Sequence, residues 1–314
     1  MDAIRCESLC KNFGNLRAVD QLNVSVEQGS TFGFLGPNGA GKTTTLRLLT
    51  GLTNPTSGQM WVAGEDVSSR PMDLRSKVGY LPESPSFYGW MKGREFLLFT
   101  ASLYGIDPAK ARDRVEQLLD QVDLTDAGGR LIKGYSRGML QRLGLAQALI
   151  HQPQVLFLDE PASALDPMGR RDMLETIAAL KGETTVFVST HILSDVERVC
   201  DHVAIINRGK MVASGTIDEI RSSQHGSTFK IEVEEDPAPL ASLLGGREWL
   251  TSMEGSTQGD RHLFRVAVSD MDTAKKELPR LVYESGLTLL HYELAQASLE
   301  DVFVDLVTEG EVGE

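Results

Sequence analysis

A short run of residues carries the clearest chemistry in this sequence. Gly36-Pro37-Asn38-Gly39-Ala40-Gly41-Lys42-Thr43 fits the spacing G-x-x-x-x-G-K-[ST]. Its glycines let successive backbone N–H groups turn inward around phosphates, and the helix that follows directs its positive end at them. Lys42 is placed to reach the β- and γ-phosphates of ATP, and the Thr43 hydroxyl to hold Mg²⁺. The spacing therefore predicts a site for ATP and Mg²⁺.

An acidic pair supplies a second part of this chemistry. The apolar run Leu156–Leu158 is followed directly by Asp159 and Glu160. A strand that ends in this way places its carboxylates at the top of a sheet, facing the phosphate loop. Asp159 would bind Mg²⁺, and Glu160 would act as general base on the attacking water. A pair that only caps the next helix is the alternative, which the phosphate loop upstream disfavours.

Three further motifs and one aromatic residue make a family resemblance visible. The segment Tyr135–Arg142, which reads Tyr-Ser-Arg-Gly-Met-Leu-Gln-Arg, resembles the signature motif of ABC ATPases, usually Leu-Ser-Gly-Gly-Gln. Ser163–Asp166 resembles the D-loop of that family, and His191 its switch histidine. Phe13 occupies the position of an aromatic ring that stacks on adenine. Motif order and spacing match over Met1–Thr216, about two thirds of the chain.

The resemblance implies that one copy of the chain holds only half a site. In this family two nucleotide-binding domains pack head-to-tail, and the signature of one closes over the ATP held by the other. Ser136 and the Gly138 backbone would then donate to the γ-phosphate, Asp166 would link the two sites, and His191 would sense the γ-phosphate. For His191 a strand-end histidine that caps a loop is the alternative. The expected nucleotide contacts are Phe13, Gly36, Pro37, Asn38, Gly39, Ala40, Gly41, Lys42, Thr43, Thr44, Ser136, Gly138 and Asp166, and the expected catalytic residues are Glu160 and His191.

Three positions depart from the usual pattern of the family. Arg137 stands where the signature usually has Gly, Met139 where it has Gln, and Glu83 where the loop Gly79–Glu83 usually has Gln. A carboxylate can still bind Mg²⁺, so the expected metal ligands are Thr43, Glu83 and Asp159. The departures could mark a degenerate site. However, Tyr-Leu-Pro-Glu and Tyr-Ser-Arg-Gly-Met are similar to the ATP-binding subunits of ABC-2-type exporters, and Ser298–Phe303 is similar to their closing C-terminal helix, which favours an active site.

The surrounding periodicity predicts an α/β fold, and the resemblance to ABC ATPases implies a P-loop NTPase core with an antiparallel β subdomain and a helical signature subdomain. Alternating runs predict antiparallel strands, and runs that are apolar on both sides predict parallel strands of a buried sheet. The expected strands are Ile4–Leu9, Leu22–Val26, Ser30–Leu35, Val155–Leu158, Val186–Val188 and the hairpin Val203–Ile206 with Lys210–Ala213. The expected helices are Thr43–Leu49, Glu95–Tyr104, Ala109–Val122, Met139–Ile150 and Arg170–Leu180.

A second, smaller domain is expected after a polar linker at Arg221–Ser227. Beyond this linker the pattern restarts in the order βαββαβ, which is typical of a small α+β, ferredoxin-like domain. Its last strand is expected at Leu287–Tyr292, followed by a terminal helix at Leu299–Leu306. The net charge is −13, and most of the excess follows Glu219. The predicted domains are therefore residues 1–220 and 228–314.

Composition narrows the function. The chain has three cysteines, no secretory pattern and no window of roughly 18 apolar residues, so we expect a cytoplasmic protein. Its negative charge disfavours nucleic acid as a partner. We expect an ATP-hydrolysing homodimer that lies on the cytoplasmic face of the membrane and energises export through integral membrane permease subunits.

Two other functions stay open at this point. One is an ABC ATPase that acts on nucleic acid or ribosomes, and the other is an importer ATPase with a ligand-sensing C-terminal domain. The aromatic segment Phe87–Met91 is either buried packing or the place where a permease docks. The cargo is not specified, because its path lies in the permease.

Overall fold

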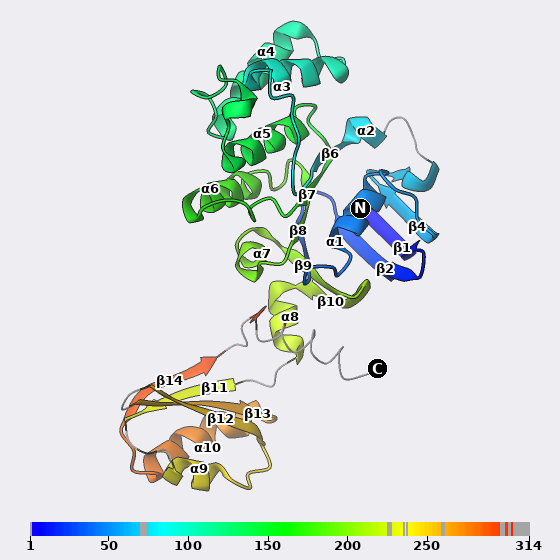
Figure 1. Ribbon diagram of the computed structural model, residues 1–314. Helices are drawn as coiled ribbons and strands as arrows, with labels where there is room; N and C mark the ends of the chain where they lie inside the picture. The colour runs from blue at the N-terminus through cyan, green and yellow to red at the C-terminus, as the bar shows by residue number, and fades with distance from the viewer. Residues whose placement is uncertain are drawn as a thin grey trace. The chain divides into compact units, whose positions relative to one another are not determined.

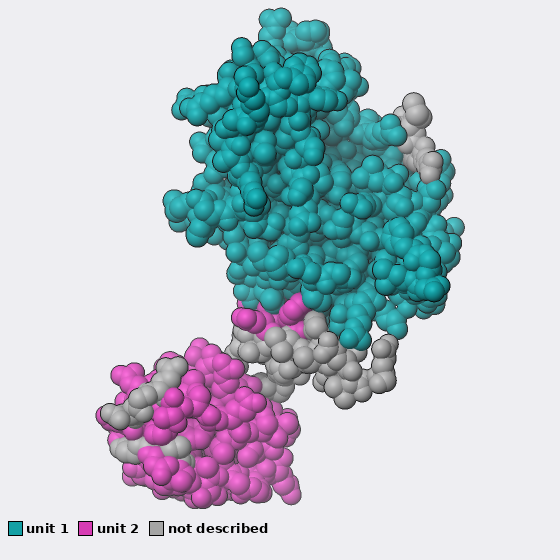
Figure 2. All heavy atoms as spheres, in the orientation of Figure 1, with its two compact units in different colours: residues 1–216 teal, residues 217–314 magenta. Residues whose placement is uncertain are grey.

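The computed structural model describes residues 2–69, 74–224, 228–234, 236, 238–258, 261–295, 299–300 and 303. The chain divides into two compact units, residues 1–216 and residues 217–314 (Figure 2). No helix within the described ranges is both long enough and apolar enough to traverse a bilayer.

Unit 1 is built around a six-stranded sheet in the order β10-β9-β3-β8-β7-β6 (Figure 1). These strands are β3 (Thr31–Leu35), β6 (Val78–Leu81), β7 (Val155–Asp159), β8 (Thr185–Thr190), β9 (His202–Asn207) and β10 (Lys210–Thr216). Neighbouring strands run parallel except for β10, which pairs antiparallel with β9. Every residue of β7 and β8 is buried, which confirms the parallel strands predicted from their continuous apolar runs.

Aromatic side chains pack across the middle of this sheet. The ring centroid of Phe187 on β8 lies 5.3 Å from that of Phe34 on β3 and 5.7 Å from that of Phe157 on β7. All three rings are fully buried, so they fix the neighbouring strands in one register. Because these strands are parallel, their carboxyl ends meet at one edge of the sheet, called here the carboxyl edge.

A second, four-stranded antiparallel sheet has the order β2-β1-β4-β5. Its strands are β1 (Asp2–Phe13), β2 (Leu16–Glu27), β4 (Ser57–Val62) and β5 (Glu65–Asp66). The first two confirm the predicted antiparallel pair and extend it at both ends. Strand β4 has no clear pattern in the sequence, because only Met60 and Val62 of this short strand are fully buried.

The helices of unit 1 include a group formed by α3, α4 and α5, which pack on one another in Figure 1 and form the predicted helical subdomain. The helical elements are α1 (Lys42–Leu49), η1 (Val67–Ser69), α2 (Leu74–Lys77), α3 (Gly93–Leu103), α4 (Pro108–Gln121), η2 (Ile132–Gly134), α5 (Arg137–Leu149), α6 (Pro167–Ala178) and α7 (Leu193–Val199). The expected helix at Arg170–Leu180 is α6, which begins earlier because Asp166 caps it and Pro167 occupies its first position.

Unit 2 confirms the predicted βαββαβ order. After α8 (Ile217–Gln224) its elements are β11 (Thr228–Val233), α9 (Ala238–Leu244), β12 (Leu250–Gln258), β13 (Arg261–Val268), α10 (Met271–Glu284) and β14 (Leu289–Ala295). The four strands form an antiparallel sheet in the order β12-β13-β11-β14, as in a ferredoxin-like fold. Phe229, Val266 and Leu278 belong to its separate hydrophobic core.

Three expectations about local structure need correction. The predicted linker at Arg221–Ser227 is wrong in its first half, since α8 continues to Gln224 around a buried Ile220. The predicted loop Gly79–Glu83 begins as strand β6, which ends at Leu81. The last strand starts and ends later than expected. The expected helix at Leu299–Leu306, which includes most of Ser298–Phe303, lies largely outside the described residues.

Candidate active site

The phosphate loop joins β3 to α1, and two close backbone approaches fix its path. A Cβ atom at Gly36 would lie 2.4 Å from the carbonyl oxygen of Ile206. Gly41 has a φ of 108°, and a Cβ atom there would lie 2.4 Å from the carbonyl oxygen of Ala18. Glycine is the residue that fits both positions without displacing the backbone of β9 or β2. The loop therefore brings the N-terminus of α1 to the carboxyl edge, where a phosphate would meet its N–H groups.

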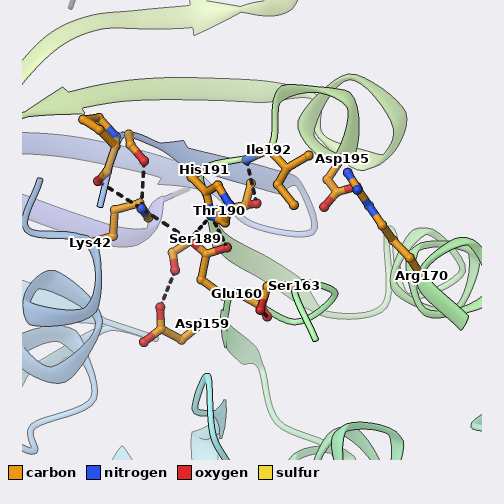
Figure 3. Close-up of polar contacts among 12 residues, drawn as sticks. Lys42, Asp159, Glu160, Ser163, Arg170, Ser189, Thr190, His191, Ile192 and Asp195 are labelled. Carbon is orange, nitrogen blue, oxygen red and sulfur yellow. Dashed lines mark hydrogen bonds and ion pairs between the residues drawn. The ribbon is translucent and has the colours of Figure 1, made fainter. Parts of the chain in front are cut away.

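Lys42 connects this loop to the acidic end of β7. The side chain is buried, and its Nζ donates to the carbonyl oxygens of Gly36 at 2.7 Å and Pro37 at 3.2 Å. The same Nζ lies 3.3 Å from Oε1 of Glu160 (Figure 3). The ammonium group is thus a buried positive charge held between the phosphate loop and a carboxylate.

Asp159 is the last residue of β7 and is almost completely buried. Its Oδ1 accepts a hydrogen bond of 2.5 Å from the Ser189 hydroxyl on the neighbouring strand β8 (Figure 3). Its Oδ2 is buried without any hydrogen-bond partner. A buried carboxylate oxygen without a partner costs free energy, so this atom is suited to receive a cation or a water molecule.

Glu160 follows Asp159 in an unusual backbone conformation. Its φ is 48°, in the left-handed region that a glutamate rarely adopts. Its N–H donates to the carbonyl oxygen of Ser189 at 2.9 Å, and its own carbonyl oxygen accepts from the Ser163 hydroxyl at 3.0 Å. The turn directs the carboxylate to Lys42 and to His191, whose Nδ1 lies 3.0 Å and 2.9 Å from the two carboxylate oxygens. Strain of this kind persists where the surrounding contacts hold it, as they do here.

A second group of expected residues lines a hollow of about 600 Å³. Ser136, Arg137 and Gly138 line it on the side of α5, and Asp166 lines it at the start of α6. The Ser136 hydroxyl oxygen accepts from the Met139 N–H at 3.2 Å, and the Asp166 carboxylate accepts from the Gly169 N–H at 2.9 Å. Both side chains therefore act as helix N-caps within their own segments. We call this feature the signature hollow.

The remaining expected residues belong to the phosphate loop, to α1, to the end of β1 and to the segment after β6. Lys42, Thr43 and Thr44 open α1, whereas Pro37, Asn38, Gly39 and Ala40 form the loop before it. Phe13 ends β1, and its ring is 52% exposed, as a ring that stacks on a ligand must be. Glu83 is exposed and follows the end of β6, the strand next to β7.

Tyr80 on β6 lies within the electrostatic influence of this edge. Burial raises the pKa of Tyr80 to about 12, and the charges of Asp159 and Glu83 act in the same direction. The charge and hydrogen bond of Arg47 lower the Tyr80 pKa but do not offset burial. Carboxylates near the ends of β6 and β7 therefore both act on the same tyrosine.

Two features of the site escaped sequence reasoning. Ser189 holds Asp159 because the β7–β8 register places these residues side by side. Arg170 on α6 bonds Asp195 on α7, a short helix that the sequence did not reveal. A polar residue near the end of an apolar strand was the available signal for Ser189, whereas the Arg170 contact depends on helix packing.

Comparison with known proteins places this geometry in context. A family model described as ABC transporter matches residues 19–163. A second model, described as the C-terminal domain of DrrA1-3-like ATP-binding proteins, matches residues 215–307. The first match lies within unit 1, which carries the P-loop fold, and the second covers most of unit 2, which carries the ferredoxin-like fold.

Relatives extend the similarity over the full chain. The uncharacterized ABC transporter ATP-binding protein YxlF of Bacillus subtilis (strain 168) is 38% identical, over 96% of this chain and 98% of that protein. The bacitracin transport ATP-binding protein BcrA of Bacillus licheniformis is 35% identical, over 99% of each chain. A solved ATP-binding subunit of an ABC transporter has a TM-score of 0.65 and 29% identity, covering 70% of this chain and 92% of that one.

Proposed function

This chain belongs to the family of ABC transporter ATP-binding proteins, and we propose that its ATP site is completed only when the signature of a second copy closes over it. It is an ATP-hydrolysing subunit that energises export through a separate membrane-spanning permease. One observation carries the proposal. The groups expected at the γ-phosphate are divided, since Lys42 and His191 both contact Glu160 while Ser136 and Gly138 line a separate hollow.

In the proposed site the phosphate loop and α1 hold the triphosphate of ATP. Phosphate oxygens would replace Glu160 as the charged partner of Lys42, because their charge is larger and the Lys42 ammonium already faces the loop. Phe13 would stack on the adenine with its exposed ring. In the signature of the second copy, Ser136 and the Gly138 N–H would donate to the γ-phosphate from the opposite side. Asp166, exposed at the start of α6, would link the two sites.

Mg²⁺ fits the oxygen donors of this edge. The unpartnered Asp159 Oδ2 and the Thr43 hydroxyl are hard ligands of the kind that Mg²⁺ prefers, and the exposed Glu83 carboxylate is a third. Nowhere in the described ranges do three His, Cys, Asp or Glu side chains gather closely enough to hold a metal alone, so phosphate oxygens would complete the set. When bound, the ion would neutralise charge on the phosphates.

Hydrolysis needs a base for the attacking water, and Glu160 is the proposed one. Its carboxylate is buried and lies between Lys42 and His191. When ATP replaces Glu160 as the partner of Lys42, the free carboxylate would be able to accept a proton from water. His191 Nδ1 would hold the carboxylate, and its other ring nitrogen would face the γ-phosphate. Transfer of the water proton to Glu160 then accompanies formation of the new O–P bond and release of ADP.

ATP-binding subunits of ABC transporters generally dimerise and pair with membrane permeases, and an aromatic groove is the proposed permease contact. The groove measures about 710 Å³ and includes Tyr88, Phe99 and Leu103, which are 52%, 40% and 69% exposed. Trp90 next to it is 74% exposed. Apolar exposure of this extent is typical of an interaction surface. Through this contact the protein would lie on the cytoplasmic face of the membrane.

Substitution Glu160→Gln tests the proposed site directly. We expect ATP turnover to fall by about 10²–10⁴-fold, because the amide cannot take the water proton. We expect ATP binding to persist and the ATP-bound dimer to accumulate, since hydrolysis no longer separates the copies. Turnover is measured by phosphate release, and the molar mass with and without ATP by light scattering.

Glu116→Gln is the matched control, because Glu116 is a half-exposed glutamate on α4 whose partner is Arg94. It should retain turnover and show no stable dimer. A Glu160→Gln protein that stays monomeric at saturating ATP would contradict the proposal that two copies share each site. Turnover at the normal rate would contradict the assignment of Glu160 as base.

A further inference from the structure

A partly buried ion pair joins helices α6 and α7. Arg170 Nε on α6 donates to Asp195 Oδ1 on α7 at 2.7 Å, and Arg170 Nη2 lies at the same distance from that oxygen (Figure 3). Nη2 also donates to the Ser194 hydroxyl at 3.1 Å. The guanidinium group therefore holds the first turn of α7 through two consecutive residues.

Each partner of this ion pair lies close to a loop of the proposed ATP site. Arg170 is in the first turn of α6, and its N–H donates at 2.8 Å to the carbonyl oxygen of Asp166, the residue that caps this helix. Asp195 is in the first turn of α7, which begins directly after the His191 loop, and its N–H donates to the Ile192 carbonyl oxygen at 3.2 Å. The pair thus connects the Asp166 loop to the His191 loop.

The electrostatics tie Asp195 to the same region. Asp195 is only 4% exposed, and burial raises its pKa, while the hydrogen bond and charge of Arg170 act against this shift. The nearby charge of Glu160 also raises the Asp195 pKa, and that of His191 lowers it. Arg170 is the cation that offsets this buried negative charge beside Glu160, and removing one partner of such a pair is costly.

We propose that Arg170 and Asp195 are positioning residues of the ATPase reaction, whose ion pair fixes the start of α7 and so keeps His191 on the Glu160 carboxylate. In the part of the chain that the structure describes, the side-chain bonds of Arg170 go to Asp195 and Ser194, so the pair acts through the loop that carries His191. Because Arg170 lies in α6, the ion pair also makes the position of the His191 loop depend on α6. A movement of the Asp166 loop caused by the second copy would therefore also affect the His191 loop. The proposal rests on the roles given above to Glu160 and His191.

The same two helices offer a matched control. Arg198 on α7 donates to Glu175 on α6 at 2.9 Å, but these side chains are 42% and 52% exposed and lie at the other ends of the helices. If Arg170 only helps α6 and α7 pack together, loss of Arg198 should resemble loss of Arg170. If Arg170 positions His191, only loss of Arg170 should slow the reaction.

The first measurement compares kcat and KM for ATP in the full chain. For Arg170→Met we expect kcat to fall by about 10- to 100-fold, the range for small misplacement of a reacting group, with KM changed by about twofold at most. Arg198→Met should leave both constants unchanged. Arg170→Lys should recover most of kcat, because the ammonium can still meet Asp195. Should Arg170→Met fold poorly, Arg170→Met with Asp195→Asn leaves no charge unpaired and should show the same loss.

The second measurement combines Arg170→Met with His191→Ala. His191→Ala alone should lower kcat by about 10²-fold. If Arg170 acts through His191, the double variant should lose no more than that, whereas independent effects would multiply. Multiplying effects, or equal losses in Arg170→Met and Arg198→Met, would overturn the positioning role. An unchanged kcat in His191→Ala would instead overturn the role of His191, and with it the reason for the ion pair.

Discussion

The carboxyl edge and the signature hollow both contain residues expected at the γ-phosphate, yet their contacts differ in kind. At the carboxyl edge, polar side chains from different elements bond one another, as Lys42 and His191 bond Glu160. Around the signature hollow, Ser136 and Asp166 bond only backbone groups of the helices that they cap. The bonded side chains of the edge are distant in sequence. Ser136 and Asp166 instead each bond within one helical turn, beside an Arg142–Asp123 ion pair that also lines the hollow.

The difference teaches which half of the site depends on a partner. A group that already bonds its catalytic neighbours needs only ATP to complete its contacts, and ATP binding should be a property of one copy. The capped N-terminus of α5 lines an open hollow together with Asp123, Asp126 and Arg142, and the positive end of the helix suits an anion. Substitutions in the phosphate loop should therefore alter ATP binding, and substitutions at the hollow should alter turnover without altering binding.

The largest contrast is expected from Ser136→Ala. The variant removes the acceptor of the Met139 N–H, which costs about 1 kcal/mol of stability. It also removes a donor proposed to meet the γ-phosphate across the dimer, a loss worth about 10²–10³ in kcat. Affinity of the isolated chain for a fluorescent ATP analogue should be unchanged. Turnover, analogue titration and thermal melting measure the three effects.

Asp107→Ala provides the control for lost capping. Asp107 caps α4 by accepting from the N–H groups of Ala109 and Lys110, and it lies outside the signature hollow. Its loss should lower stability by a similar amount and leave turnover intact. If Ser136→Ala weakened ATP binding by the isolated chain, the hollow would belong to the same chain's site and the comparison would fail.

Gly36→Ala should give the converse result, with a smaller effect. The added methyl group would lie 2.4 Å from the Ile206 carbonyl oxygen, so the loop or β9 must move. Overpacking of this kind costs about 1–3 kcal/mol, and if the bound state carries that cost, ATP binds about 10- to 100-fold more weakly. Analogue titration measures this loss. Gly129→Ala, with no atom within 4 Å of the new methyl group, should bind ATP normally; equal binding by Gly36→Ala would remove the argument for a fixed loop.

Sequence reasoning predicted the residues whose roles depend on local spacing. The phosphate loop, the pair Asp159 and Glu160, and the signature segment are each contiguous, so their types and order could be read directly. The fold classes of both units followed from periodicity. These predictions rest on local features of the chain, namely glycines for a tight loop and an apolar run for a buried strand.

Contacts between elements could not be predicted in this way. The Ser189 bond to Asp159 depends on the register of β7 and β8, and the Arg170 bond to Asp195 on the packing of two helices. Helix α7 has seven residues, which is too short for a helical period to be recognised, and β6 has only four residues, which do not distinguish a strand from a loop. Contacts of this kind form only in the folded chain, and no spacing of residues in the sequence indicates them.

The smallest effect is expected from Glu83→Gln, at the border of the carboxyl edge. Glu83 is exposed, and Gln offers Mg²⁺ an amide oxygen in place of the carboxylate, so turnover should change by about twofold or less. Complete loss of turnover would mean that the carboxylate does chemistry that an amide cannot. The informative readout is the pKa of Tyr80. Burial raises this pKa most, and the charges of Asp159 and Glu83 raise it further.

Because the Tyr80 pKa rises from 10.0 to about 12 in the folded chain, the folded state keeps a proton that the unfolded state loses first. Tyr80 therefore contributes stability that is fully present below pH 10.0 and lost as the pH rises to about 12. Glu83→Gln should lower the alkaline midpoint of Tyr80 in ultraviolet absorbance, with Tyr80→Phe identifying the signal and Glu116→Gln leaving it in place. If the midpoint does not move, the charge of Glu83 does not act on Tyr80, and Asp159 and Glu160 remain as the acidic residues of the carboxyl edge.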